Sequence, residues 1–243
     1  MARFELLGTA TIPGKGTQLR LLQRNDEFAI KIAGTTGELM NSRLHGSEDA
    51  LATLACERIA DHPAPRVLIG GLGMGFTLAA ALQALGDTAE VTVAELVPEV
   101  ESWNRGPLGA AAGYPLLDPR ARVHLGDVVQ LIRDSANTYD AILLDIDNGP
   151  EGLTRKENDW LYTTAGVEAA QAALRPDGIL AYWSAGQDPS FTERLKPQTG
   201  RMQFWRTGLP VRIRPSPNGS SGRGCQWIRS RYGRIVPARA HAM

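Results

Sequence analysis

The most constraining feature of this 243-residue sequence is a regular alternation of short apolar segments and segments with helical spacing that starts at Arg66. It predicts strands at 67–69, 90–95, 122–125, 139–145 and 179–183, with helices at 76–85, 127–132 and 161–174. Strands that alternate with helices form parallel sheets with right-handed crossovers. The sequence therefore predicts an α/β fold, in which ligands bind beyond the carboxyl ends of the strands.

The chain outside this alternation is expected to form smaller units. Short, partly alternating stretches around a turn cluster at Pro13–Gly16 predict a small antiparallel β unit in residues 1–45. We expect the main domain to span residues 46–235, with a last strand near 225–230, and residues 236–243 to form a basic tail.

Composition and charge argue against several classes of protein. The formal net charge is zero, so the molecule as a whole does not attract polyanions. No acidic residue follows Glu193, but the arginines of that stretch are scattered. We therefore interpret this basic stretch as a solvated edge followed by a disordered end. A surface that binds nucleic acid remains the alternative.

Cysteine usage and hydropathy indicate the compartment. Cys56 and Cys225 lie far apart and no Cys-x-x-Cys pair is present, so neither a metal site nor a disulfide framework is expected. The N-terminus lacks the apolar segment of a signal peptide, and no apolar run reaches the roughly 18 residues that cross a membrane. We expect a cytoplasmic protein without membrane partners.

A glycine-rich segment follows the first parallel strand and includes Gly70, Gly71, Gly73 and Gly75. Glycines allow a sharp turn and a close approach of the backbone to a ligand, although a purely structural turn would use the same residues. The Gly-x-Gly-x-Gly spacing differs from the dinucleotide fingerprint, because Phe76 stands where that pattern needs its last glycine. A pyrophosphate is therefore not the favoured ligand.

Acidic residues end the next three predicted strands. Glu95 comes about 20 residues after the glycines, where an acid can accept hydrogen bonds from ribose hydroxyls. Asp127 could accept a hydrogen bond from an adenine amino group or could simply cap the following helix. Asp145 and Asp147 stand at the end of a central strand, where chemistry occurs, although Asp-Asn-Gly-Pro sequences also form plain turns.

Together these residues resemble the class I S-adenosylmethionine-dependent transferases and, more narrowly, the spermidine synthase (polyamine aminopropyltransferase) family. The resemblance runs from about residue 37 to residue 183 and rests on Gly70–Gly75, Val93–Pro98, Gly126-Asp127, Tyr139–Asp145 with Asp147–Pro150, Leu161-Tyr162 and Leu174–Gly178. It implies a Rossmann-like methyltransferase fold with a mostly parallel seven-stranded sheet, and a homodimer or higher oligomer.

The resemblance also implies roles for individual residues. Glu95 would hold the ribose of the cofactor, Asp127 would contact its adenine, and Asp145 would face the reacting centre, with Asp147 as the alternative base. Transfer from a sulfonium needs no strong acid, but an amine acceptor must lose a proton, which a carboxylate can accept. Tyr162 could flank a cationic acceptor, or it could pack in the core.

The sequence departs from the family pattern at three places. The family's glycine loop carries an aspartate at the position of Gly73, and that acid helps to hold the free amine of decarboxylated S-adenosylmethionine. Asp145 and Asp147 are two residues apart instead of three. The family's tyrosine-histidine-glutamate segment is replaced by a stretch in which His45 and Glu48 could face the substrate, although Glu48 could instead complement a helix dipole.

Three functions follow from these observations. The absence of the acid at Gly73 favours transfer of a methyl group from S-adenosylmethionine to a small amine. The alternative is an aminopropyltransferase that uses decarboxylated S-adenosylmethionine. A non-catalytic nucleotide-sensing or partner-binding protein is the hypothesis from a different class.

Overall fold

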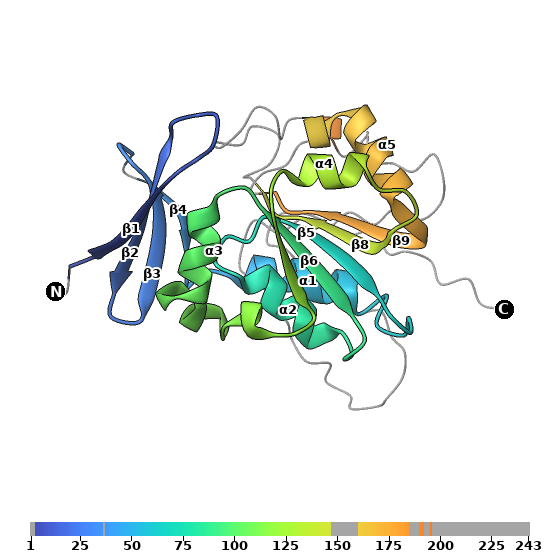
Figure 1. Cartoon of the computed structure of the whole chain (residues 1–243), viewed down its shortest axis with the longest axis horizontal. Coiled ribbons are helices and arrows are strands. Elements are labelled where there is room, and N and C mark those ends of the chain that lie inside the picture. Colours follow the sequence, from blue (N-terminus) through green and yellow to red (C-terminus); the bar gives the residue numbers. More distant parts are fainter. Residues whose placement is uncertain (1–2, 36, 147–159, 185–189, 192–194, 196–243) are drawn as a thin grey trace.

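The computed structural model describes residues 3–35, 37–146, 160–184, 190, 191 and 195, which form two sheets (Figure 1). The smaller sheet lies near the N-terminus and is antiparallel, with its strands in sequence order. Its strands are β1 (Glu5–Thr11), β2 (Gln18–Arg24), β3 (Glu27–Ile32) and β4 (Glu38–Asn41). The predicted N-terminal β unit is confirmed.

The larger sheet is parallel throughout and has the strand order β7-β6-β5-β8-β9. Its strands are β5 (Arg66–Gly70), β6 (Glu90–Glu95), β7 (Ala121–Leu125), β8 (Tyr139–Leu144) and β9 (Leu174–Tyr182). The order reverses beside β5, which creates the crevice where α/β sheets bind ligands. The predicted α/β class is confirmed with five described strands, and the strand expected near 225–230 lies outside the described residues.

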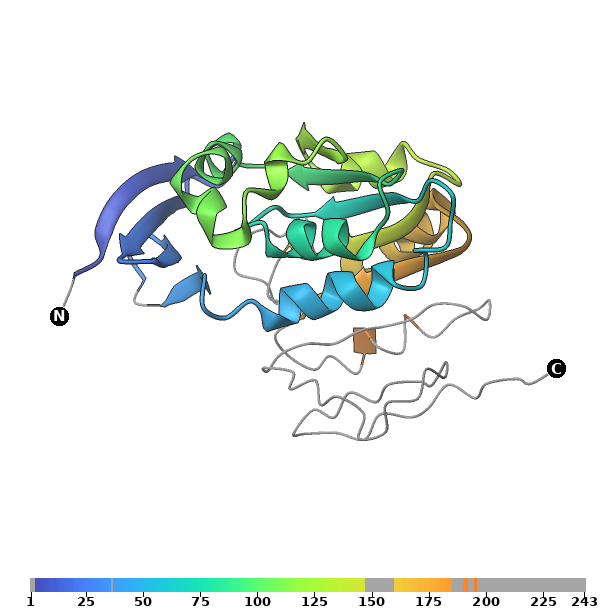
Figure 2. The same cartoon turned by 90° about the horizontal axis from the view of Figure 1, so that it is seen from below.

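Helices cover both faces of this sheet (Figures 1 and 2). On one face lie α1 (Gly46–Cys56), α2 (Phe76–Ala84) and α3 (Pro98–Arg105), and on the other α4 (Val128–Arg133) and α5 (Thr164–Ala173). Two short 3₁₀ helices, Pro107–Ala112 and Pro115–Leu117, follow α3. Among the described residues, no helix has the length and apolar character needed to span a bilayer.

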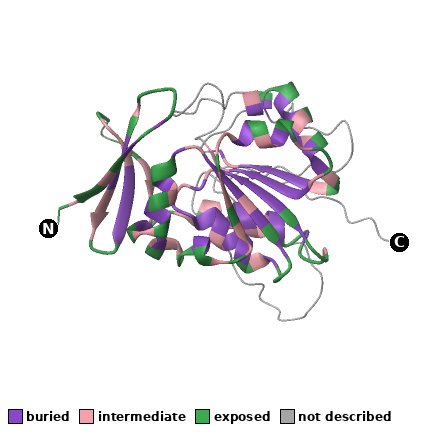
Figure 3. Cartoon of the chain, in the orientation of Figure 1, coloured by how far each residue is buried: buried purple, intermediate pink, exposed green. Residues whose placement is uncertain are grey.

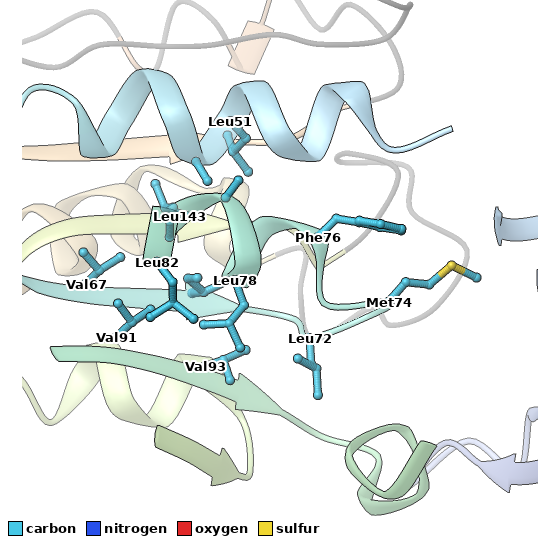
Figure 4. Close-up of a cluster of buried hydrophobic side chains, with 14 of the residues drawn as sticks. Leu51, Val67, Leu72, Met74, Phe76, Leu78, Leu82, Val91, Val93 and Leu143 are labelled. Atoms are coloured by element: carbon cyan, nitrogen blue, oxygen red, sulfur yellow. The ribbon is translucent and has the colours of Figure 1, made fainter. Parts of the chain in front are cut away.

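Alternation of side chains along the strands produces the two cores. In β5, Val67 and Ile69 pack toward α1 and α2, whereas Leu68 points to the opposite face and packs with α4 and α5. Figure 4 shows Val67 with Leu51 of α1 and Leu82 of α2 in the first core. The central strands β5, β6 and β8 are almost wholly buried (Figure 3), as expected for a sheet covered on both faces, whereas the edge strand β7 is partly exposed.

Two local features of the structure differ from what the sequence pattern predicts. The sequence pattern does not predict helix α3, although Pro98 at its first position is a typical start signal. Strand β9 begins at Leu174 rather than Ile179, because Pro176–Gly178 forms an irregularity in its pairing with β8 instead of a turn before the strand.

Candidate active site

A cavity of about 130 Å³ lies between the carboxyl ends of the parallel strands and the N-terminal sheet. One side is formed by residues at the ends of β5, β6, β7 and β8, and the other by apolar residues of the N-terminal unit. The lining consists of Ile12, Leu19, Ile30, Leu39, Met40, Gly71, Gly73, Ala94, Glu95, Leu96, Val97, Val100, Gly126, Asp127, Val128, Asp145 and Ile146. The structure thus brings together the strand ends that the sequence predicts to bind a ligand.

Gly71 is the position in the glycine-rich segment with the strongest steric requirement. Its φ is +89°, and a Cβ atom there would lie 2.2 Å from the backbone oxygen of Asp145. Only glycine avoids both the left-handed strain and this overlap. The segment after β5 therefore passes directly against the backbone that carries Asp145, which itself donates its N–H to the carbonyl of Gly70 over 2.9 Å.

The other glycines shape the turn around the cavity. Gly73 lines the cavity with a φ of +51°, and a Cβ there would lie 3.3 Å from the Sδ atom of Met40. Its carbonyl accepts a hydrogen bond of 2.9 Å from Nδ2 of the buried Asn104. Gly70 packs inside the sheet and Gly75 immediately precedes α2 with a φ of +84°, and neither belongs to the described lining.

Glu95 is a buried carboxylate at the end of β6 that lines the cavity. Its two oxygens accept backbone hydrogen bonds from Leu72 over 3.0 Å and from Val97 over 2.9 Å. Burial raises the pKa of this carboxyl, and the backbone N–H donors oppose that shift. The side chain is therefore fixed at the strand end beside the cavity, where the predicted bond to ribose hydroxyls would form.

Asp127 caps a helix and also lies in the cavity lining. Its Oδ1 atom accepts the N–H of Val129 over 2.9 Å and so caps α4. The residue also lines the cavity. Capping and a place in the lining are compatible, so the contact with an adenine amino group stays a prediction.

Asp145 follows β8 and carries its side chain into the cavity lining. Its Oδ2 accepts a hydrogen bond of 2.6 Å from the hydroxyl of Thr77. Burial raises the pKa of Asp145 to about 7, the Thr77 hydrogen bond opposes this shift, and the negative charge of Glu48 reinforces it. A carboxyl that titrates near neutral pH can act as a general base. Asp147 lies outside the described residues.

The two predicted substrate residues, His45 and Glu48, lie at the start of α1. His45 stacks on Phe76, the first residue of α2, with ring centroids 4.1 Å apart, and its Nδ1 atom lies 2.7 Å from Asp49 Oδ2. Glu48 influences Asp145 electrostatically. Neither belongs to the described cavity lining, so their contact with a substrate stays a prediction.

Tyr162 lies in the second hydrophobic core instead of the cavity lining. It is 2% exposed, and its ring centroid lies 5.6 Å from that of Tyr182 and 5.0 Å from that of Phe191. This environment matches the packing role that the sequence left open. Its proposed contact with a cationic acceptor stays a prediction.

Three residues that shape the site could not be identified from the sequence. The sequence pattern around Met40 and the neighbouring apolar residues of the N-terminal sheet indicates only buried positions in strands. In the structure these residues form one wall of the cavity. Thr77 and Asn104 lie on helices and bind Asp145 and Gly73, respectively. No sequence spacing links these pairs, because they meet only after the sheet has formed.

Comparison with known proteins supports the architecture. A family model described as the spermine/spermidine synthase domain matches residues 59–196. The spermidine synthase from Thermotoga maritima superposes with a TM-score of 0.57 and 18% identity over 74% of this chain and 57% of its own. A spermidine synthase in complex with the transition state analogue AdoDATO superposes with a TM-score of 0.54 and 18% identity. This match covers 72% of this chain and 55% of that protein. No curated protein sequence matches the chain.

The structural matches and the family match support different conclusions. Because the structural identities lie below 25%, they indicate a shared fold alone. The chain also spans little more than half the length of these two proteins. The family model, by contrast, covers more than half of this chain, including all the acidic residues at the strand ends.

Proposed function

Because this chain belongs to the spermine/spermidine synthase domain family, we propose that it transfers an aminopropyl group from decarboxylated S-adenosylmethionine to a small amine. The alternative derived from the sequence thus becomes the leading hypothesis, ahead of methyl transfer. The family match supports an adenosyl sulfonium transferase, and one structurally similar spermidine synthase binds the transition state analogue AdoDATO. The choice of substrate and of the group transferred rests on the chemistry of the cavity.

The charge of the cavity is the observation that carries this proposal. Its described lining includes the carboxylates Glu95, Asp127 and Asp145 and contains no lysine, arginine or histidine. Such a site favours a cationic ligand and offers no cationic side chain to a carboxylate. Decarboxylated S-adenosylmethionine carries a sulfonium and an ammonium, whereas the intact cofactor adds a carboxylate that would depend on backbone N–H groups.

The residues present suit an adenosyl ligand. Glu95, held by two backbone donors, would accept hydrogen bonds from the ribose hydroxyls, and Asp127 would accept one from the adenine amino group. The backbone at Gly71 and Gly73 lines the cavity without side chains and leaves room for close approach. The apolar wall around Met40 would exclude water from the reacting centre.

We assign the role of proton acceptor to Asp145. When bound, the cofactor supplies a carbon attached to a positively charged sulfur, and the acceptor nitrogen bonds to that carbon as the carbon–sulfur bond breaks and its electron pair stays on a neutral thioether. The nitrogen then carries one proton too many, which the Asp145 carboxylate can accept. The negative charge of Asp145 and Glu48 would also attract a protonated amine to the site, where the amine must lose its extra proton to solvent before its lone pair can bond to carbon.

Mass spectrometry of the reaction products tests this proposal. The protein is incubated with decarboxylated S-adenosylmethionine and a panel of monoamines and diamines, and we expect one acceptor to gain an aminopropyl group together with release of methylthioadenosine. The matched control is Asp145→Asn, for which we expect kcat to fall about 10²- to 10⁴-fold with cofactor binding intact. No product from any acceptor, with cofactor bound, would contradict the proposal and favour a non-catalytic binding protein.

Methyl transfer stays a second candidate because of one observation. Gly73 has no acid to hold the ammonium of the cofactor, and the space beside it is occupied by the thioether of Met40. The same incubation with S-adenosylmethionine distinguishes the two reactions, since a methylated acceptor and S-adenosylhomocysteine would appear instead. Turnover with the intact cofactor alone would make methyl transfer the function.

A further inference from the structure

Asp145 is held from three directions by the segment that runs from β5 into α2. Its backbone N–H donates to Gly70, its backbone oxygen lies against Gly71, and its side chain accepts the hydroxyl of Thr77. Thr77 is the second residue of α2 and is 2% exposed. The side-chain bond is therefore partly buried and joins two residues that the packing of the sheet and helix keeps in place.

This contact gives the two oxygens of the carboxylate different environments. Oδ2 accepts the Thr77 hydroxyl at 2.6 Å, a length typical of a hydrogen bond from a hydroxyl to an ionised carboxylate. Among the described residues, the Thr77 hydroxyl is the one hydrogen-bond donor to this carboxylate, and Asp145 lines the cavity. An oxygen that is already bonded is a poorer proton acceptor than its neighbour.

The charged groups described around Asp145 are all acidic, so the hydrogen bond from Thr77 matters for the ionisation of its carboxyl. Glu48 of α1 acts on it electrostatically, while Glu95 and Asp127 line the same cavity from β6 and from the end of β7. The described lining offers no cationic side chain that would favour the ionised form. Of the groups described around the carboxyl, Thr77 is the one whose hydrogen bond stabilises the negative charge.

We propose that Thr77 is a positioning residue: its hydroxyl holds Oδ2 of Asp145, favours the ionised form of the carboxyl, and directs Oδ1 toward the acceptor amine. This role deepens the proposed function and rests on it for the identity of the amine. The bond between Thr77 and Asp145 itself does not depend on any substrate, so it can be tested on the free protein.

The first test is the titration of the Asp145 carboxyl carbon by NMR, with its signal assigned from the Asp145→Asn spectrum. Thr77→Val keeps the shape of the side chain and removes the hydroxyl, and we expect the midpoint to move to higher pH. Thr77→Ser keeps the hydroxyl and should titrate close to the parent protein. Thr88→Val is the matched control, because Thr88 donates a similar bond of 2.7 Å to the carbonyl of Pro63, away from the cavity.

The second test is the pH profile of turnover with the acceptor identified by product analysis. For Thr77→Val we expect kcat at pH 7 to fall by about tenfold, KM for the cofactor to change little, and the acidic limb to move to higher pH. If the valine variant does not fold, Thr77→Ala replaces it in both tests.

The outcomes separate this role from the proposed function. An unchanged midpoint in the valine variant, or a serine variant that behaves like the valine variant, would overturn the role of the Thr77 hydroxyl. A shifted midpoint in a protein that turns over no amine would uphold the contact and refute the proposed function instead.

Discussion

At the scale of single residues, the Asp145 carboxyl sets the pH dependence of the site. Its ordinary pKa of 3.8 is raised to about 7 in the folded chain, mainly by burial. Protonation thus stabilises the folded protein more than the unfolded chain. Stability is unaffected by this group below about pH 4, declines as the pH rises toward 7 because the folded chain must then ionise a buried acid, and is constant above that range.

The variant Asp145→Asn removes this cost, so it should be more stable than the parent at pH 8 but not at pH 4. After a discount for the partial exposure of the side chain, we expect a gain of about 1–2 kcal/mol, or roughly 2–8 °C in Tm. Thermal unfolding at both pH values measures it, with the exposed Asp61→Asn as control. An equal change at both pH values would contradict the raised pKa.

Glu48 acts on the same group in the opposite direction to Thr77. Glu48→Gln removes a negative charge near Asp145, so the carboxyl should ionise more easily and the acidic limb of the pH–rate profile should move to lower pH. Glu57→Gln, at the far end of α1, is the control. A limb that stays in place or moves upward would show that Glu48 does not act on Asp145.

At the scale of secondary-structure elements, the glycine-rich turn and β8 must approach each other closely. Gly71→Ala places a Cβ atom 2.2 Å from the oxygen of Asp145 in a left-handed conformation, and we expect a loss of at least about 3 kcal/mol in stability. Gly14→Ala is a matched control, because its φ is +78° and no atom lies within 4 Å. It should cost about 1 kcal/mol, from strain alone.

Urea unfolding of both variants measures the difference between these costs. Equal losses would mean that only the backbone conformation matters at Gly71, and that the close contact with the Asp145 backbone contributes nothing.

The elements also show which parts of the site are predictable. Glu95, Asp127 and Asp145 could be found from the sequence because parallel strands bring their carboxyl ends to one edge. The bond between Thr77 and Asp145 could not, since it joins residues 68 positions apart and depends on how α2 packs on the sheet. Helix α3 could not be predicted from its composition, because it is short and polar on average, although it is amphipathic and its Trp103 packs against Gly8 of β1.

At the scale of the whole molecule, the N-terminal sheet completes the cavity and places Met40 beside Gly73. Gly73→Asp would add a carboxylate there, at a backbone conformation that aspartate tolerates better than most residues, with a small shift of Met40. We expect the variant to favour decarboxylated S-adenosylmethionine over the intact cofactor more strongly than the parent does, because the new charge attracts the ammonium and repels the carboxylate.

Competition binding with the two cofactors measures that preference, and Gly73→Asn, which adds the same shape without charge, is the control. If the aspartate and asparagine variants have the same preference, the cofactor's charged end does not lie beside residue 73.

The central claim is that the acidic cavity binds an adenosyl sulfonium that lacks a carboxylate, and isothermal titration of the full chain with each cofactor tests it most directly. We expect decarboxylated S-adenosylmethionine to bind at least about tenfold more tightly than S-adenosylmethionine, since the described lining carries three carboxylates and no cation. Tighter binding of the intact cofactor would contradict the claim and return methyl transfer to first place.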